Sequence, residues 1–418
     1  MIEKRNPIPV SDAIQRVINH VQPLPIKKIE LEKASGYILR EPIIATHAVP
    51  PFNRSAYDGY AIRAEDSVGA SPHHPIAFHV VGEIGAGQLP EVPIGKNEAY
   101  RIMTGAILPE QADAIVMLEK TTKTNDGFTV LESLQPGDHV SFKGEDAKKG
   151  EVLIEPGTKI HPGTIALLAT FGYANVNVTK KPIAGVLATG TELLDVNESL
   201  QPGKIRNSNG PMIQAQLDRL GISCRSYGML PDDLDACMEV MEQALQETDV
   251  VITTGGVSVG DYDYLPALYK RLGAKVLFNK VMMRPGSVTT VAALGDKLLF
   301  GLSGNPSACF TGFELFARPA ILTMMGSNEP YLAHIHATLG EAFTKHNPFT
   351  RFIRGIWKMT KQGVIAIPAG FNKSNAISSI ARGNCLIVLP SGSSGYRKGM
   401  QVDILLLGVD QGEEKWRL

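Results

Sequence analysis

The first regular pattern of hydrophobic and polar positions lies near the N-terminus, over residues 10–21. Apolar residues recur there at intervals of three and four, as on one face of an α-helix. Ser11 can cap the first turn, and Pro23 and Pro25 follow the last turn, which proline cannot continue. The pattern predicts an amphipathic helix over residues 10–21 with this apolar stripe: Val10, Ile14, Val17, Ile18 and Val21.

Residues 51–145 have a different pattern, in which short runs alternate apolar and polar residues. Gly, Pro and an Asn-Asp-Gly sequence separate these runs and favour turns. This alternation predicts a compact β-rich domain. Residues 26–50 also resemble strands and short turns, and residues 146–180 contain turns and a short apolar helix near 165–170. We expect these two flanking segments to meet, which makes the β-rich domain an insertion.

Between residues 181 and 326, apolar strands alternate with segments of helical spacing. A further helix is expected from Pro306 through Thr323, because proline suits the first turn of a helix. This rhythm predicts a doubly wound parallel sheet, whose ligands bind beyond the carboxyl ends of the strands. The strands are expected at 183–188, 250–253 and 298–302, and the helices near 213–220, 234–245 and 265–272.

Residues 327–418 return to short strands and turns, which predict a C-terminal β barrel. The expected fold class is therefore α/β plus β, in an elongated chain of several domains. We expect a linker or elongated domain from residues 1–50 and 146–180, with its helix 10–21 packed on the α/β domain. The remaining expected domains are the inserted β-rich domain (51–145), the α/β domain (181–326) and the barrel (327–418).

Composition narrows the class of protein. Lys and Arg number 41 and Asp and Glu number 42, and no basic run suggests a nucleic-acid surface. Hydrophobic residues make up 44% of the chain, but no apolar run is long enough to cross a membrane. The four cysteines have no metal or redox spacing, which is typical of a reducing compartment. We expect a cytoplasmic protein without a nucleic-acid or membrane partner.

The most informative stretch is the glycine-rich loop over residues 253–264, directly after an apolar strand. Its glycines let the backbone approach a ligand and direct several N–H groups at one point, as for phosphate. Its two carboxylates repel phosphate, so we expect a divalent cation such as Mg²⁺ between them and the ligand. The alternative is a tight loop in which Asp263 is an ordinary helix cap. The candidate residues are Gly255, Gly256, Ser258, Gly260, Asp261 and Asp263.

Further loops of similar design occur in the same domain. Residues 189–192 follow the first strand and end in Glu192, a candidate metal ligand with Asp261 and Asp263. Residues 207–210 precede a helix, and residues 303–307 follow the last strand. Each loop alone could be a simple cap, but together at one sheet edge they predict a site for a phosphate-rich ligand. Their candidate binding residues are Ser208, Ser303, Gly304, Asn305 and Pro306.

Two cations, Lys280 and Arg284, lie four residues apart, and Pro-Gly-Ser follows Arg284. Paired cations can be solvated charges at a strand end, but a rigid turn favours a directed Arg284 that grips an oxyanion. Asp58 and Asp146 lie in dense polar turns, where either can be a turn residue or a site carboxylate.

The ten histidines show no metal-site spacing. His334 and His336 point to one side of a predicted strand, where we expect a core or surface role rather than ligation.

Four motifs in order resemble the molybdenum insertase family, also called the MoeA or molybdopterin molybdenumtransferase family, which is related to the E domain of gephyrin. They are Arg54-Ser-Ala-Tyr-Asp-Gly-Tyr-Ala, Arg101-Ile-Met-Thr-Gly-Ala, Thr254-Gly-Gly-Val-Ser-Val-Gly-Asp-Tyr-Asp and Leu302-Ser-Gly-Asn-Pro-Ser. The resemblance covers essentially the whole chain. It implies an elongated homodimer of four-domain subunits, with a cleft between the α/β domain of one subunit and the β-rich domain of the other.

The resemblance also implies a reaction, in which molybdate is inserted into adenylylated molybdopterin with Mg²⁺-dependent release of AMP. Molybdopterin adenylyltransferase and molybdoenzyme-maturation proteins would then be partners. The family's functional residues correspond to Asp58, Thr104, Asp146, Glu192, Asp263, Lys280 and Arg284, and its molybdate-binding Arg and Ser to Arg354 and Ser374.

Three positions depart from the family pattern. Tyr57 stands where Met is frequent, and Ser303 replaces a frequent Pro. Ser287 removes a cation from the turn after Arg284, which changes the expected anion affinity.

Two other functions compete with this one. A molybdopterin adenylyltransferase resembles the α/β domain alone and would load AMP onto molybdopterin from ATP. A scaffold of the gephyrin type would not need the site carboxylates. The residues flanking the α/β domain argue against the first, and the absence of a fused second domain within these 418 residues argues against the second.

Overall fold

The computed structural model describes residues 5–230, 233–256 and 265–418. The chain folds as two compact units. One comprises Met1–Glu41, Pro156–Ile165 and Ala174–Leu418, and the other comprises Pro42–Glu155 and Ala166–Tyr173. We call these the α/β-barrel unit and the β-rich unit and describe each by itself.

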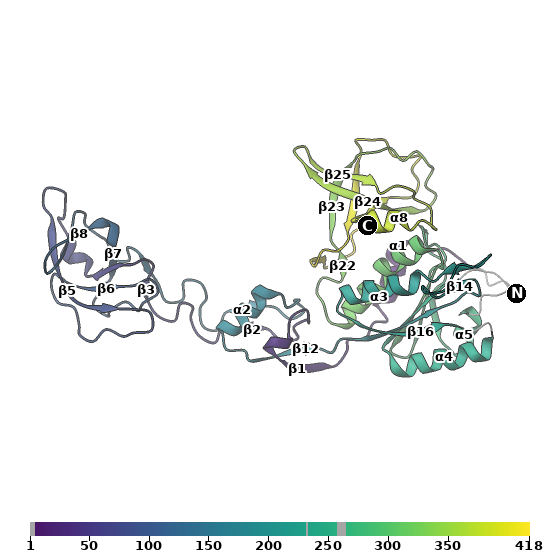
Figure 1. The fold of residues 1–418 in the computed structure, drawn as a ribbon, viewed down its shortest axis with the longest axis horizontal. Coiled ribbons are helices and arrows are strands. Elements are labelled where there is room, and N and C mark those ends of the chain that lie inside the picture. Colours follow the sequence, from purple (N-terminus) through teal and green to yellow (C-terminus); the bar gives the residue numbers. More distant parts are fainter. Residues whose placement is uncertain (1–4, 231–232, 257–264) are drawn as a thin grey trace. The chain divides into compact units, whose positions relative to one another are not determined.

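The β-rich unit is built on a six-stranded sheet in the order β7-β4-β6-β5-β9-β8 (Figure 1). Both faces of the sheet are covered by apolar side chains, Ile84 and Ile102 on one and Phe78 and Val130 on the other. The rings of Tyr60 and Phe128 stack on the second face with centroids 3.8 Å apart. The sheet strands are β4 (Gly59–Ile62), β5 (Ile76–Ile84), β6 (Glu98–Ile102), β7 (Ala114–Met117), β8 (Thr121–Lys123) and β9 (Gly127–Val130).

Short elements complete this unit. Strand β3 (Arg54–Ser55) pairs with β10 (Val140–Ser141), and β2 (Ile43–Ile44) pairs with β11 (Val152–Ile154). Two 3₁₀ turns, η2 (Ala64–Ser67) and η3 (Leu118–Lys120), connect strands of the sheet. The helix α2 (Pro162–Thr170) begins in a segment of one unit and ends in a segment of the other.

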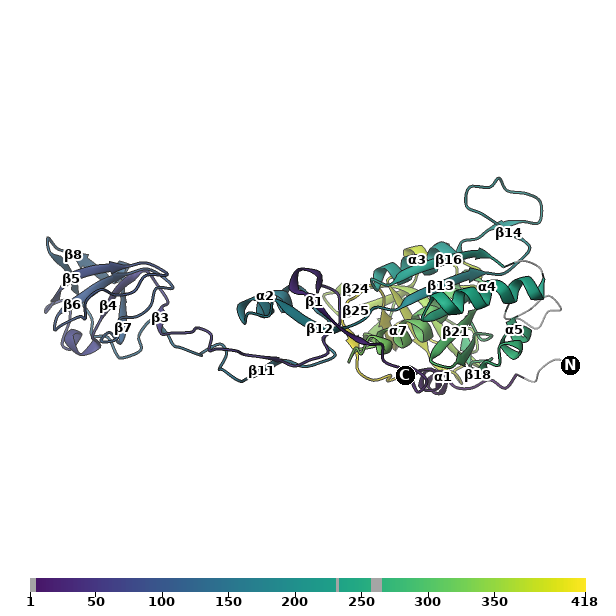
Figure 2. The ribbon, with the colours of Figure 1, turned by 90° about the horizontal axis from the view of Figure 1, so that it is seen from below.

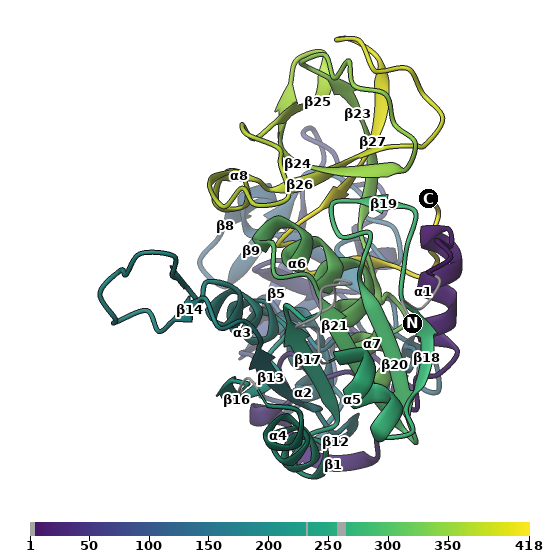
Figure 3. The same ribbon diagram turned by 90° about the vertical axis from the view of Figure 1, so that its right-hand side faces the viewer.

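The α/β-barrel unit contains a six-stranded sheet in the order β16-β13-β17-β21-β20-β18 (Figure 3). The first four strands are parallel, whereas β20 and β18 are antiparallel to their neighbours. The four parallel strands form the predicted parallel sheet, and β20 and β18 add an antiparallel edge to it. The strands are β13 (Ile183–Ala188), β16 (Ser223–Met229), β17 (Val250–Thr254), β18 (Lys275–Phe278), β20 (Thr290–Leu294) and β21 (Lys297–Leu302).

A two-residue turn explains the antiparallel edge. Leu294 pairs with Lys297, so only Gly295 and Asp296 connect β20 to β21. Gly295 has φ 61°, a left-handed conformation that hairpin turns of this length require at their first position. A parallel connection needs a crossover of a dozen residues or more, which this segment does not have.

Helices cover both faces of the sheet. The helix α1 (Val10–Ile18) and the helix α3 (Asn209–Arg219) bury their apolar residues in one core, with α6 (Pro306–Gly312) and α7 (Arg318–Met324). The other face carries α4 (Leu234–Glu247) and α5 (Leu265–Arg271). The N-terminal helix lies against β18 and α7 (Figure 2). Its buried residues are Val10, Ala13, Ile14 and Val17.

The single long helix expected from Pro306 is interrupted. Between α6 and α7, the segment η4 (Phe313–Ala317) is π-helical. Pro319 follows in the first turn of α7. Its ring has no N–H for an i→i−4 hydrogen bond and its bulk is incompatible with a regular turn, so the preceding turn widens.

The C-terminal part is a closed β barrel of five strands, as predicted. Strands β24, β25, β23, β27 and β26 pair in that order, and β26 also pairs with β24. Its buried residues include Ile353, Ile387 and Ile404. The barrel strands are β23 (His334–Leu339), β24 (Thr350–Thr360), β25 (Gly363–Pro368), β26 (Cys385–Leu389) and β27 (Gln401–Leu406), with the helix α8 (Ser378–Arg382).

The α/β-barrel unit also contains short paired strands. Strand β1 (Ile26–Glu30) pairs with β12 (Asn175–Thr179), and η1 (Leu31–Lys33) follows β1. Strand β14 (Leu193–Leu194) pairs with β15 (Ile205–Arg206), and β22 (Tyr331–Leu332) pairs with β28 (Gly412–Glu413). Strand β19 (Met283–Arg284) leaves the α/β part and joins β24 at the edge of the barrel sheet.

Candidate functional site

The loops predicted to bind an anion meet at the carboxyl edge of β13, β17 and β21. Thr189 donates its backbone N–H to the carbonyl of Thr254 at 2.9 Å, and Gly255 donates to the carbonyl of Leu302 at 2.9 Å. From the start of α3, the side-chain amide of Asn209 donates to the carbonyl of Gly304 at 2.8 Å. These hydrogen bonds hold the loops in register around a common opening.

These loops line a cavity of about 810 Å³, here called the glycine-loop cavity. It contains every described loop residue that the sequence predicted for the phosphate-rich ligand. They are Glu192, Ser208, Gly255, Gly256, Ser303, Gly304, Asn305 and Pro306. The cavity lies beyond the carboxyl ends of the parallel strands, where open α/β sheets bind their ligands.

Gly255 and Gly256 are required by the geometry of this edge. Their φ angles are 90° and 63°, a region that L side chains rarely adopt. A Cβ on Gly255 would lie 2.5 Å from the carbonyl oxygen of Thr189, and one on Gly256 would lie 2.8 Å from the Thr189 hydroxyl. The two glycines therefore let the β17 loop pack directly against the β13 loop.

Two helix starts leave polar side chains for a ligand. Ser208 precedes α3 and Asn305 precedes α6, and neither side chain makes a capping hydrogen bond. Asn207 performs part of that task, because its Oδ1 accepts a hydrogen bond from the N–H of Gly210 at 3.0 Å. Simple capping therefore does not account for Ser208 and Asn305.

A second cavity, of about 740 Å³, has cationic walls and is here called the cationic cavity. It lies between the start of α6 and the barrel. No carboxylate occurs among the described residues that line it, and no described carboxylate forms an ion pair with its cations. Those cations are Arg284, Lys345, Arg351, Arg354 and Lys373.

Strand pairing places two of these arginines side by side. Strand β19 runs parallel to the start of β24, and the register places Arg284 beside Arg351. Burial, and then repulsion from Arg284, lower the pKa of the Arg351 guanidinium. Like charges on neighbouring strands are destabilising unless an anion lies between them. The pairing therefore favours an anionic ligand.

Arg354 is the largest of the almost fully buried side chains, with 2% of its surface exposed. Its guanidinium donates to the Ser379 hydroxyl at 3.3 Å and to the Lys373 carbonyl at 3.0 Å, both neutral acceptors. Burial lowers its pKa to about 10. A buried cation without a counter-ion is costly, and an anion in the cavity would offset that cost.

The two cavities are neighbours. Both are lined by Val288, Ser303 and Asn305. The barrel loop that carries Ser374 is fixed to the start of α6, because Ser307 donates its N–H to the Ser374 carbonyl at 3.0 Å. The Ser307 hydroxyl also donates to the carbonyl of Ala376 at 2.6 Å. Ser374 lines the cationic cavity together with Arg354.

Lys280 lines neither of these cavities. Its backbone carbonyl accepts a hydrogen bond from Ile8 at 3.2 Å, where residues 8 and 281 form an isolated bridge. The pairing of Lys280 and Arg284 in one cation site stays a prediction.

The remaining described candidates lie in the β-rich unit. Asp58 accepts two hydrogen bonds from Thr104, from the backbone N–H at 2.7 Å and the hydroxyl at 2.8 Å. These two bonds, the backbone one first, lower the pKa of the Asp58 carboxyl. Asp146 is exposed, and its N–H donates to the carbonyl of Val49 at 3.0 Å.

Four predicted residues, Ser258, Gly260, Asp261 and Asp263, lie outside the described residues. Glu192 is the one predicted metal ligand that the structure describes, and it is exposed at the rim of the glycine-loop cavity. Among described residues, the one cluster of three His, Cys, Asp or Glu ligands lies elsewhere, at His334, His336 and Asp403.

Part of the cationic cavity, namely Lys345, Arg351 and Lys373, was not predicted from the sequence. Arg351 and Arg354 are three residues apart on a strand, where regular alternation would place them on opposite faces. The one available signal was the number of cations between residues 345 and 373 without nearby acids. That signal becomes specific only when the barrel closes.

A glycine-lined cavity beside a cation-lined one defines a class of protein that binds two anionic groups side by side. Comparison with protein families specifies this class. Residues 8–172 match the MoeA N-terminal region (domain I and II). Residues 185–323 match a probable molybdopterin binding domain, and residues 336–407 match the MoeA C-terminal region (domain IV).

Similar proteins support the assignment over the full length. A relative from Staphylococcus aureus (strain COL), named molybdopterin molybdenumtransferase, is 53% identical over 415 residues, covering 99% of each chain. One from Staphylococcus epidermidis (strain ATCC 12228 / FDA PCI 1200) with the same name is 51% identical, also covering 99% of each. The crystal structure of the molybdopterin biosynthesis moeA protein from Pyrococcus horikoshii OT3 has a TM-score of 0.84 and 30% identity. It covers 96% of this chain and 100% of its own.

The chain belongs to the MoeA family. It is an enzyme of the transferase class, as the resemblance implied. Among the described residues, no helix is both long enough and apolar enough to cross a bilayer.

Proposed function

We propose that the chain transfers molybdenum from molybdate to molybdopterin, as a step of molybdenum cofactor biosynthesis. The finer proposal is that molybdopterin enters in its adenylylated form and that AMP is released in a Mg²⁺-dependent reaction. The observation that carries the proposal is the shared wall of the two cavities, formed by Val288, Ser303 and Asn305. It allows two anionic substrates to be held next to each other.

Molybdate suits the cationic cavity. It is a tetrahedral dianion and needs several donors that converge with positive charge. Arg284, Arg351 and Arg354 supply planar guanidinium donors, and Ser374 adds a polar side chain beside them. Guanidinium groups bind oxyanions through two parallel hydrogen bonds, which gives both affinity and orientation.

The adenylylated pterin suits the glycine-loop cavity. Its pyrophosphate would face the backbone amides around Gly255 and Gly256 and the side chains of Ser208 and Asn305. Amides that are already held by the fold stabilise charge on a phosphoryl group without further reorganisation.

Glu192, with Asp261 and Asp263, would hold Mg²⁺. Carboxylate oxygens are the ligands that Mg²⁺ prefers, and the exposed Glu192 carboxylate lies at the rim of the cavity. When bound, Mg²⁺ would neutralise charge on the pyrophosphate as AMP leaves. The backbone amides of this chain would hold the pyrophosphate while these carboxylates bind the ion.

A homodimer belongs to the same proposal, as the resemblance implies. Asp58, Thr104 and Asp146 in the β-rich unit would complete the site carried by the α/β domain of the other subunit. The ionised Asp58, with its lowered pKa, would then offer a fixed negative charge to that site. Lys280 would help to hold the anionic ligand. Molybdopterin adenylyltransferase would supply the substrate, and molybdoenzyme-maturation proteins would receive the product.

One assay separates this function from its rivals. The protein is mixed with adenylylated molybdopterin, molybdate and Mg²⁺, and AMP is followed. A parallel mixture contains unmodified molybdopterin, ATP and Mg²⁺, and ATP is followed. We expect AMP release that depends on molybdate. ATP consumption with unmodified molybdopterin would instead identify an adenylyltransferase. If Glu192→Ala, Arg351→Met and Arg354→Met all retain full activity, the two cavities are not the active site and a scaffold role becomes the better account.

A further inference from the structure

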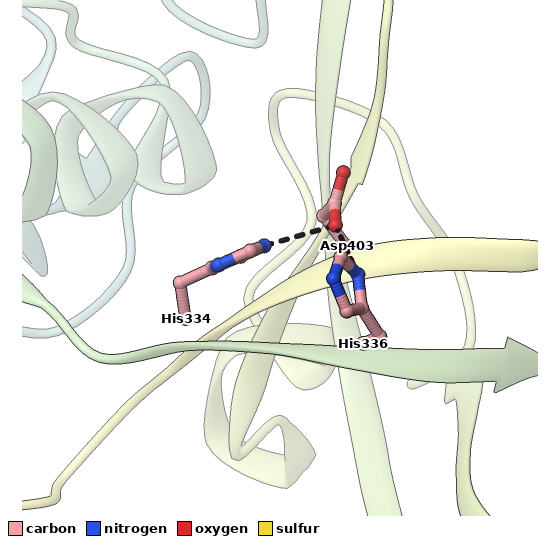
Figure 4. Close-up of side chains that lie close together, drawn as sticks. All are labelled: His334, His336 and Asp403. Carbon is pink, nitrogen blue, oxygen red and sulfur yellow. Dashed lines mark hydrogen bonds and ion pairs between the residues drawn. The ribbon is translucent and has the colours of Figure 1, made fainter. Parts of the chain in front are cut away.

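Outside both cavities, three metal-ligating side chains converge on the barrel. His334 Nε2 lies 2.9 Å from Asp403 Oδ1, and His336 Nδ1 lies 2.7 Å from the same oxygen. The ligand atoms of all three residues lie within 4.8 Å of one another. Figure 4 shows both rings directed at the carboxylate. The three side chains are therefore already in contact before any ion binds.

The strand register explains the convergence. His336 on β23 is paired directly with Asp403 on β27, whereas His334 is paired with Leu405 and reaches Asp403 diagonally. Direct and diagonal neighbours on one face of an antiparallel pair are within reach of long side chains. The alternate residues Ala337 and Ile404 are buried in the barrel. The three polar side chains therefore share the outer face of the sheet.

The three side chains differ in how much of their surface is exposed to solvent. His334 is 13% exposed, Asp403 is 27% exposed and His336 is 75% exposed. The first two are held by the fold, whereas His336 can adjust its ring when an ion enters. Two imidazole ligands and a carboxylate would also leave coordination positions open toward the solvent.

We propose that His334, His336 and Asp403 form a site for one divalent transition-metal ion of the Zn²⁺ class. Imidazole nitrogen with a single carboxylate oxygen favours such ions over Mg²⁺, which prefers oxygen ligands. Ligand atoms around tetrahedral Zn²⁺ are separated by roughly 3.3 Å, as follows from bond lengths of about 2.0–2.1 Å. The present separations of 2.9 and 2.7 Å thus need to widen by only about half an ångström.

Bound to these residues, the ion would connect two strands whose ligands are 69 positions apart in the chain. It would do so in place of the hydrogen bonds that the rings now make to Asp403. A ligand that binds only the folded state stabilises it. The site is thus assigned a structural ion whose open positions are filled by water, and it is independent of the proposed transferase reaction.

The test is titration of the metal-free full-length protein with Zn²⁺ in a calorimeter. We expect one equivalent to bind, and binding to raise the thermal unfolding midpoint. His336→Ala and, separately, Asp403→Asn should weaken binding by at least about tenfold and remove that rise. Because His336 is mostly exposed, the metal-free His336→Ala variant should unfold at the wild-type midpoint.

Two control variants separate this site from general surface binding. Gln401→Ala removes a polar side chain on the same strand and face, which donates to Thr338 at 3.0 Å. His79→Ala removes an exposed histidine on β5 of the β-rich unit. Both should bind Zn²⁺ like the wild type.

Co²⁺ provides a spectroscopic check against the cysteines. Cys237, Cys309 and Cys385 are buried, and burial raises the pKa of Cys224 to about 11. We expect visible ligand-field bands without thiolate charge transfer. The proposal is overturned if the wild type binds no Zn²⁺, if His336→Ala and Asp403→Asn bind it equally well, or if the Co²⁺ spectrum shows thiolate ligands.

Discussion

Hydrogen bonds from Thr104 favour the ionised form of Asp58. Thr104 gives the same carboxylate oxygen both a backbone and a hydroxyl hydrogen bond, and both favour the ionised form. Because the folded pKa is lowered, this contribution to stability is present above the unfolded pKa. It is lost as pH falls through the folded pKa. The charge of Asp58 is thus retained at mildly acidic pH.

Replacement of the Thr104 hydroxyl should raise the pKa of Asp58. In Thr104→Val the backbone N–H remains, so we expect only part of the lowering to disappear. Thr104→Ser keeps the hydroxyl and serves as the control, with the pKa of the wild type. Titration of the Asp58 side-chain carboxyl carbon by NMR measures all three. An equal pKa in Thr104→Val and the wild type would show that the hydroxyl contributes nothing.

Arg354 should supply much of the anion affinity. Arg354→Met preserves length and apolar bulk but removes the charge from the cationic cavity. We expect molybdate to bind more weakly by about 1.5–3 kcal/mol, which is roughly 10- to 150-fold in the dissociation constant. The exposed Arg382→Met, in α8, should have no effect. Calorimetric titration with molybdate decides, and equal losses in both variants would contradict a specific role for Arg354.

The residues of the glycine-loop cavity were easier to predict from the sequence than those of the cationic cavity. Gly255, Ser208 and Asn305 could be found because each follows a strand or precedes a helix, and parallel strand ends meet at one edge. Arg351 could not be found, because its neighbourhood depends on the pairing of β19 with β24. That pairing links residues 283–284 to residues 350–351, and no local pattern in the chain reports it.

Among the elements, the π-helical segment η4 carries a buried charge. Glu314 is 1% exposed, and its Oε1 accepts hydrogen bonds from Gln216 at 2.7 Å and from Arg219. Both donors belong to α3, so these two hydrogen bonds fix α3 against η4. Removal of Glu314 would leave the guanidinium of Arg219 without its counter-charge and the side-chain amide of Gln216 without its acceptor.

Glu314→Ala should therefore destabilise the α/β-barrel unit by about 2–4 kcal/mol, less than for a fully buried pair because Arg219 is partly exposed. The control is Asp235→Ala, which breaks the exposed pair with Arg271 and should cost less than about 1 kcal/mol. Urea unfolding followed by the fluorescence of Trp357 and Trp416 measures both. Similar shifts in the two variants would show that burial of Glu314 does not matter.

Helices were predictable where the spacing of apolar residues alone indicated them. The helices at 213–220, 234–245 and 265–272 correspond to α3, α4 and α5. The interruption at residues 313–317 was missed because the apolar spacing continues through it, whereas Pro319 acts on the backbone. The antiparallel edge depends on the short Gly295-Asp296 turn, which the β-α-β rhythm does not report.

On the scale of the whole molecule, the proposed dimer makes a complementation prediction. Asp58→Ala and Arg354→Met subunits should each have low activity alone when molybdate is well below saturation for the Arg354→Met variant. If each site combines the β-rich unit of one subunit with the α/β-barrel unit of the other, a mixed dimer has one intact site. Random exchange of subunits should then restore about a quarter of wild-type activity, since about half the dimers are mixed and each has one intact site of two. No recovery after confirmed exchange would place all site residues in one subunit.

The central claim is that molybdate insertion and AMP release are one coupled reaction at the two neighbouring cavities. The most direct measurement is a single turnover with adenylylated molybdopterin and Mg²⁺, in which AMP and pterin-bound molybdenum are quantified together. The account predicts equal amounts of both products, and almost no AMP without molybdate or in excess chelator. Full AMP release in the absence of molybdate, or molybdenum insertion without AMP release, would contradict it.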